Sequence, residues 1–123
     1  MSSDCIFCQP DRLILAQSTL SLAFPDGFPV SKGHTLVVPK RHVVSLWEMT
    51  SEEYMDAFDL VRQVKEVLEK MFTPQGFNVG VNCGETAGQS VSHVHIHVIP
   101  RYTGDVPNPR GGIRNVIPGK GNY

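Results

Sequence analysis

Three alternating histidines constrain the fold of this chain more than any other feature. His93, His95 and His97 are separated by Val94 and Ile96. Alternation of this kind is the period of a β-strand, in which successive side chains point to opposite faces of the sheet. We therefore expect the histidines to share one face, about 6.6 Å apart along the strand. The apolar residues between them should face the core.

A row of imidazoles is difficult to explain by packing alone. Each ring carries nitrogen atoms that need partners when they are buried. One or two core histidines bonded to backbone carbonyl groups would be ordinary, but this alternative does not explain three in register. The row therefore indicates metal binding or nucleophilic attack on phosphorus by a neutral imidazole. At this spacing the three rings are too far apart for all of them to bind one zinc ion.

Composition limits the class of protein. The chain has 123 residues, which suits a single domain over residues 1–123, and its net charge is −1. No bulk charge favours nucleic acid or a membrane surface, and no apolar run has the length of a membrane span. An odd count of 3 cysteines speaks against a disulfide framework. Residues 1–4 lack the pattern of a signal peptide. These features predict a cytoplasmic protein.

A C-x-x-C pair, Cys5 and Cys8, opens the chain. Such a pair forms half of a zinc site, a redox pair or a chance spacing. A redox pair is expected where a strand ends and a helix begins, whereas this one precedes the first predicted strand. A zinc site needs two further ligands, for which the histidines are better candidates than the remote Cys83.

The rest of the chain predicts a mixed α and β domain. Apolar runs at 13–16 and 20–24 predict a hairpin, and residues 33–40 and 76–83 predict further strands. A capping box at Thr50 and Glu53 starts a helix expected over residues 51–71. Its predicted apolar stripe comprises Tyr54, Ala57, Phe58, Val61, Val64, Leu68, Met71 and Phe72. Its other face, which includes Asp56, is expected to be solvated.

Two segments without regular structure are of functional interest. The small polar loop 84–90 leads directly into the histidine strand, so it is either a simple turn or a place where backbone N–H groups meet an anion. Residues 102–123 contain three prolines and five glycines and predict an irregular tail. Arg110 and Arg114 in this tail either lie on the surface or hold a phosphate.

The segment His93–Ile99 resembles the defining motif of the histidine triad superfamily, His-φ-His-φ-His-φ-φ, where φ is apolar. The resemblance extends through residues 33–40, the capped helix and residues 82–90. Segments 101–105 and 110–114 resemble bacterial members described as diadenosine polyphosphate hydrolases. Asn115 stands where an aromatic residue is expected in similar tails, which puts the role of the tail in doubt.

This resemblance implies a fold and an activity. The fold is a small α+β domain whose five-stranded, mainly antiparallel sheet carries one long helix and continues across a homodimer. The activity is hydrolysis at the α-phosphate of purine nucleotide derivatives such as diadenosine polyphosphates, through a nucleotidyl-histidine intermediate.

The resemblance also implies roles for individual residues. His95 is the nucleophile. His97 and His34 support the phosphate and take part in the proton exchanges around it. The remaining residues implied to contact the nucleotide are Asp26 at the ribose, Asn82 and Gln89 at the phosphates, and Ser90 at the leaving group.

A structural zinc ion is implied as well. Its ligands in similar proteins correspond to Cys5, Cys8, His42 and His93 of this sequence. Such a Cys₂His₂ set is typical of a closed structural zinc site.

Three alternatives remain open from the sequence. The first is an adenosine phosphoramidase, which releases AMP from an amine. The second is a nucleotide-binding regulatory module with little turnover, although such a module has no need of the nucleophile His95. The third is a zinc-binding interaction protein.

Overall fold

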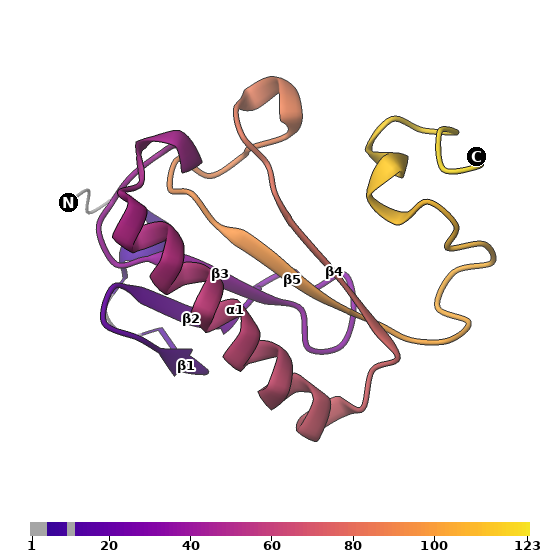
Figure 1. Ribbon diagram of the computed structural model, residues 1–123, viewed down its shortest axis with the longest axis horizontal. Coiled ribbons are helices and arrows are strands. Elements are labelled where there is room, and N and C mark those ends of the chain that lie inside the picture. Colours follow the sequence, from indigo (N-terminus) through magenta and orange to yellow (C-terminus); the bar gives the residue numbers. More distant parts are fainter. Residues whose placement is uncertain (1–4, 10–11) are drawn as a thin grey trace.

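A computed structural model describes residues 5–9 and 12–123 of the chain. Its centre is a five-stranded sheet in the order β1-β2-β3-β5-β4, and every neighbouring pair is antiparallel. The strands are β1 (Ala16–Gln17), β2 (Ser21–Pro25), β3 (Thr35–Pro39), β4 (Gly76–Val81) and β5 (Ile96–Arg101). One long helix, α1 (Ser51–Phe72), lies across one face of the sheet (Figure 1). The predicted α+β architecture is confirmed.

The capping box begins α1 as predicted. The Thr50 side chain accepts a hydrogen bond from the Glu53 backbone N–H, and the Glu53 carboxylate accepts one from the Thr50 backbone N–H. This exchange satisfies two N–H groups that the first turn of a helix leaves without partners. The helix ends at Thr73, whose φ of 49° is left-handed.

The predicted apolar stripe of α1 was wrong at two positions. Phe58 and Met71 are 43% and 56% exposed, whereas Leu60, which the stripe omitted, is fully buried. Leu60 lies three residues after Ala57 and four before Val64, which are both fully buried, so these three residues share one face of the helix. Phe58 lies one residue further round the helix and faces outward.

Asp56, predicted to lie on the solvated face of α1, instead contacts the turn between β1 and β2. Its carboxylate accepts hydrogen bonds from the Ser18 hydroxyl at 2.5 Å and from the Leu20 backbone N–H at 3.1 Å. The side chain therefore fastens α1 to the turn between β1 and β2. This contact joins residues 36 and 38 positions apart, so helix periodicity could not predict it.

Apolar side chains cover both faces of the sheet. One core cluster lies between the sheet and α1, and it includes Val94, Ile96 and Val98 as the alternation predicted. A second cluster lies on the opposite face of the sheet and includes Phe24 and Leu36. The N-terminal 3₁₀ turn Ile6–Cys8 covers it. His95 and His97 therefore point to the side of the sheet opposite α1.

The histidine segment enters the sheet later than expected. Pairing of β5 with β3 begins at Ile96, opposite Val37. The Val94 N–H instead donates to the carbonyl of Val43 at 2.8 Å, so His93 stands on an extended lead-in outside the sheet. The first predicted strand is also shorter than expected, because Leu13 lies outside β1 and is 77% exposed.

The remaining segments are irregular, with short turns. Loop 84–90 contains a 3₁₀ turn, Glu85–Ala87. The tail contains a second, Gly112–Val116, which packs against β4 at one end of the sheet (Figure 1). Within residues 5–9 and 12–123, no helix combines the length and the apolar character that crossing a bilayer requires.

Candidate functional site

A cavity of about 510 Å³ lies on the sheet face opposite α1. One part of its wall is apolar and includes Ile6, Phe7 and Leu36. The polar part brings together six residues singled out in the sequence: Asp26, His34, Asn82, Ser90, His95 and His97. The cavity therefore collects side chains from four separate stretches of the chain.

His95 is held in one tautomer. Its Nδ1 lies 2.9 Å from the carbonyl oxygen of His93, and because a carbonyl only accepts, Nδ1 must carry the proton. Nε2 is therefore the nitrogen that carries the lone pair whenever the ring is neutral. The ring is only 6% exposed and meets the edge of Phe7, with ring centroids 5.0 Å apart. A neutral imidazole with a fixed orientation is what a nitrogen nucleophile requires.

His34 and His97 form a second hydrogen-bonded unit. The Val30 backbone N–H donates to Nδ1 of His34 at 3.1 Å, so the His34 proton is on Nε2. That Nε2 lies 3.0 Å from Nδ1 of His97 and 3.5 Å from an oxygen of Asp26. When Nδ1 of His97 accepts this hydrogen bond, the proton of the His97 ring is on Nε2 and can be donated to a ligand.

Both rings of this unit are neutral near pH 7. Burial and, to a smaller extent, the charges that His95 and His34 would carry lower the pKa of His97 to about 4, against the opposing effect of Asp26. Burial also lowers the pKa of His34, although the Asp26 carboxylate opposes this shift. The three side chains lie close enough to hold a metal ion, but a proton on Nε2 of His34 favours the hydrogen-bonded chain.

Asp26 lies at the end of β2, beside this unit. One carboxylate oxygen accepts the Phe28 backbone N–H at 2.8 Å, and the other faces His34. The side chain is 17% exposed and lines the cavity. An ionised carboxylate has spare acceptor sites, so it can also accept two hydroxyl groups of a ligand.

Gln89 does not face the cavity with the other predicted residues. Its carbonyl oxygen accepts the Gly84 backbone N–H at 3.0 Å, and its amide nitrogen donates to the carbonyls of Val44 and Val91 at 2.8 and 3.0 Å. The side chain thus closes loop 84–90 on itself. Asn82 and Ser90, on either side of this loop, do line the cavity.

The four predicted metal ligands form a separate cluster next to the cavity. Nδ1 of His93 lies 3.3 Å from Sγ of Cys5 and 3.5 Å from Sγ of Cys8, and Sγ of Cys8 lies 3.4 Å from Nδ1 of His42. All four ligand atoms lie within 4.8 Å of one another. Tetrahedral zinc ligands are separated by about 3.6 Å at normal bond lengths, so the cluster fits a metal ion of this kind.

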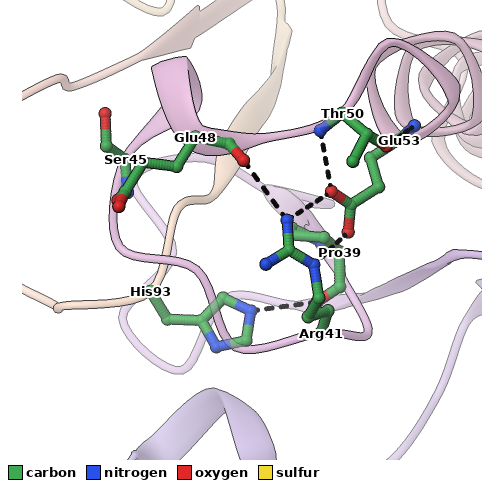
Figure 2. A network of polar contacts seen from close by, with 7 residues as sticks. All are labelled: Pro39, Arg41, Ser45, Glu48, Thr50, Glu53 and His93. Atoms are coloured by element: carbon green, nitrogen blue, oxygen red, sulfur yellow. Dashed lines mark hydrogen bonds and ion pairs between the residues drawn. The ribbon is translucent and has the colours of Figure 1, made fainter.

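The surrounding contacts prepare these ligands for a metal ion. Nε2–H of His93 donates to the carbonyl of Pro39 at 2.9 Å, which leaves Nδ1 with its lone pair (Figure 2). Burial, with the hydrogen bond and charge of Cys5, raises the pKa of Cys8 to about 11. A bound metal ion must therefore displace thiol protons.

A polar network holds the loop that carries His42. The Arg41 guanidinium pairs with both oxygens of the Glu53 carboxylate at 2.7 and 3.1 Å and donates to the carbonyl of Glu48 at 3.2 Å (Figure 2). Since Glu53 also caps α1, the loop between Pro39 and the helix is tied to a rigid element. A bidentate pair of this geometry is stronger than a single surface contact.

Phe7 and Arg12 are among the cavity residues that had no role in the sequence interpretation. Phe7 lies between the paired cysteines and contacts His95, and Arg12 lines the cavity. The only signal for Phe7 was its place inside the C-x-x-C motif, and nothing marked Arg12. The tail residues Arg110 and Arg114 lie over the ring of Tyr123, outside the cavity wall.

Comparison with known proteins identifies the family. The family model described as "HIT domain" matches residues 9–104. The chain belongs to the HIT family. Over 92 residues it is 42% identical to the bis(5'-nucleosyl)-tetraphosphatase [asymmetrical] of Schizosaccharomyces pombe, covering 75% of this chain but only 50% of that relative. Over 114 residues it is 40% identical to the adenosine 5'-monophosphoramidase hnt1 of the same yeast, covering 89% of this chain and 79% of the relative.

Solved HIT structures share the fold. A crystal structure of a Zn-bound histidine triad family protein from Mycobacterium smegmatis matches with a TM-score of 0.76 and 30% identity, covering 83% of this chain and 78% of that chain. The chain is therefore an enzyme of the HIT type.

Proposed function

We propose that this HIT protein hydrolyses purine nucleotide derivatives, such as diadenosine polyphosphates, at the α-phosphate. The observation that supports this most is the tautomer of His95, whose Nδ1–H is bound to the His93 carbonyl. The lone pair of Nε2 belongs to a ring that lines a cavity large enough for a nucleotide. The relatives named for dinucleotide and phosphoramidate hydrolysis support the same chemistry.

In the first step, Nε2 of His95 attacks the α-phosphorus. A phosphorus–nitrogen bond forms, and the bond from phosphorus to the bridging oxygen breaks. Nε2–H of His97 donates to a phosphoryl oxygen, where negative charge is stabilised in the transition state. Ser90, on the loop side of the cavity, donates a hydrogen bond to the departing oxygen.

In the second step, water attacks the phosphorus of the nucleotidyl-histidine. The phosphorus–nitrogen bond breaks and His95 regains its lone pair. A nucleoside monophosphate leaves with the oxygen of the water, whose proton passes to solvent. Asp26 holds the ribose hydroxyls through both steps, and Asn82 contacts the phosphates. Gln89 acts indirectly, since its three hydrogen bonds shape the loop that ends at Ser90.

The Cys5, Cys8, His42 and His93 cluster is proposed to hold a structural zinc ion. The donor set and its spacing support this assignment, as does the Zn-bound relative. All four positions of a tetrahedral ion would be filled by protein atoms, so this ion supplies stability rather than a reactive water.

A phosphoramidase is the second candidate. The relative named for that activity aligns with 89% of this chain. The same nucleophile serves both reactions, because the two substrates differ only in the group that leaves the phosphorus. The leaving group therefore has to be determined by assay.

The decisive experiment measures AMP release from diadenosine tetraphosphate and from an adenosine phosphoramidate. We expect turnover of at least one substrate by the wild type and a loss of about 10³-fold or more in His95→Asn. Rapid quenching with labelled substrate should trap a nucleotidyl-protein adduct in the wild type alone. Ser92→Ala, at an exposed neighbouring position, is the matched control. Full activity of His95→Asn would contradict the proposal. Nucleotide binding without turnover by the wild type would favour a regulatory module.

A further inference from the structure

The strand register orders the subsites of the cavity. Phe24 of β2, Leu36 of β3 and His97 of β5 pair in one row across the sheet. Neighbouring strands are about 4.8 Å apart, so Phe24 lies roughly 10 Å from His97. If the phosphate lies at His95 and His97 and the ribose at Asp26, the base extends over β2. Further phosphates extend the other way, toward Asn82 and Ser90 beside β4.

Arg12 occupies the β2 end of the cavity. Its guanidinium carbon lies 4.2 Å from the ring centroid of Phe24 and 5.7 Å from that of Phe7. One terminal nitrogen donates to the carbonyl of Ile6 at 2.6 Å. These contacts hold the planar group against the aromatic wall, two strands away from the phosphate subsite.

Within residues 5–9 and 12–123, the positive charge of Arg12 has no ion-pair partner. Among the described residues, no carboxylate pairs with it, and its buried Nε–H has no acceptor. Among the described residues that line the cavity, no other is a lysine or an arginine. Because Nε is closed to solvent, a ligand in the cavity would meet the terminal N–H groups of this half-buried guanidinium, which lie beside apolar walls and can donate to it.

We propose that Arg12 recognises the base of the nucleotide and favours 6-oxopurines, that is guanine and hypoxanthine, over adenine. This inference rests on the proposed function and adds the base to it. A guanidinium only donates, and guanine offers it two adjacent acceptors, O6 and N7. Adenine fits the same apolar walls but places an amino donor beside N7. Arg12 distinguishes guanine from adenine by hydrogen bonds to the edge of the base and does not contact the phosphates.

The first test uses the wild-type protein loaded with zinc. Calorimetric titration with GMP, IMP and AMP should give GMP and IMP similar affinities, each about tenfold tighter than AMP. The 7-deaza analogue of GMP, which lacks the N7 acceptor, should lose most of this advantage. AMP binding as tightly as GMP would overturn the inference and leave the proposed function standing. If none of the nucleotides binds, the inference and the proposed function both fail.

The second test uses variants of Arg12. Arg12→Met should reduce GMP affinity to that of AMP and leave AMP affinity nearly unchanged. Arg12→Lys keeps the charge but loses the planar fork, so it should also lose the preference. Arg62→Met, which removes the same charge from the exposed side of α1, is the matched control and should keep the preference. Equal weakening of GMP and AMP by Arg12→Lys and Arg12→Met would assign Arg12 to the phosphates and overturn the inference.

Discussion

Backbone carbonyl groups divide chemically identical imidazoles between two kinds of site. The carbonyl of His93 accepts from Nδ1 of His95, and the carbonyl of Pro39 accepts from Nε2 of His93. The first bond leaves Nε2 of His95 free in the cavity, and the second leaves Nδ1 of His93 free among the cysteines. A single hydrogen bond thus determines which nitrogen of each ring is available.

Asp26 provides a test of the ribose subsite. Asp26→Asn keeps the size of the side chain but removes the charge that binds two hydroxyl groups. We expect AMP to bind about tenfold more weakly to this variant, which corresponds to a charge-assisted hydrogen bond. Binding of 2′,3′-dideoxy-AMP, which lacks both hydroxyls, should be equal in the variant and the wild type. If the variant weakens both ligands equally, Asp26 does not contact the ribose.

His97 predicts a pH dependence of stability. Its pKa is about 4 in the fold, against 6.5 for the ordinary side chain, mainly because it is buried. The unfolded chain therefore takes up this proton first as the pH falls. The stabilisation is fully present above pH 6.5 and is lost between pH 6.5 and 4, by at most about 1.4 kcal/mol per pH unit.

The measurement is the free energy of unfolding in urea at pH 7, 6 and 5. His97→Gln cannot titrate, so its stability should fall less steeply with decreasing pH than that of the wild type. His34 faces His97 and has a lowered pKa as well. The stability of both the wild type and His97→Gln therefore still falls with decreasing pH. Parallel profiles would mean that His97 titrates normally in the fold.

At the scale of elements, the N-terminal 3₁₀ turn connects the metal cluster to the cavity. Cys5 and Cys8 belong to the cluster, while Ile6 and Phe7, between them, line the cavity. Phe7 is 8% exposed and contacts both Phe24 and His95. The metal ion would therefore hold one wall of the nucleotide site in place.

This connection predicts thermodynamic coupling between metal and nucleotide. We expect removal of zinc, or Cys5→Ser, to weaken AMP binding roughly tenfold, because the wall that includes Phe7 loses its anchor. By linkage, AMP should raise the affinity for zinc by the same factor. Cys83→Ser, outside the cluster, is the control and should bind one zinc ion normally. Equal AMP affinity with and without zinc would show that the wall holds its position without the metal.

At the scale of the whole molecule, β4 is an edge strand, and no strand of residues 5–9 and 12–123 pairs with its outer side. Val79 of this strand is 41% exposed, and Val116 and Ile117 of the adjacent tail are 73% and 59% exposed. An exposed edge strand with apolar neighbours is a template for pairing with another chain. We propose that two copies join along β4, as the family resemblance implies.

Light scattering after size-exclusion chromatography tests this proposal. We expect a mass of twice the 13.6 kDa of the chain. Val79→Lys should shift the protein to monomers, since a charge would be buried at the junction. Leu13→Lys, at an exposed position near the opposite edge of the sheet, should leave the mass unchanged. A wild-type mass of 13.6 kDa at micromolar concentration would contradict the dimer.

Local patterns were sufficient for much of the fold. The alternation around His95 predicted which side chains face the core, and the Thr50 capping box predicted where α1 begins. Both are correct because they depend on backbone periodicity or on groups within one helical turn. The family resemblance, rather than a local pattern, selected Asp26, Asn82 and Ser90, which line the cavity, and Gln89, which does not.

Tertiary structure decided the features that depend on distant contacts. Val94 bonds to Val43 before β5 begins at Ile96, and the Asp56 carboxylate accepts from the hydroxyl of Ser18. Spacing alone could not place Arg12 over Phe24 or turn Gln89 toward its own loop. The sequence by itself determined the histidine row and its α+β setting, because periodicity is local. Only the folded chain brings Cys5 to His93, 88 residues away, and assigns each imidazole its free nitrogen. Those contacts depend on how the sheet, the helix and the N-terminal turn pack together.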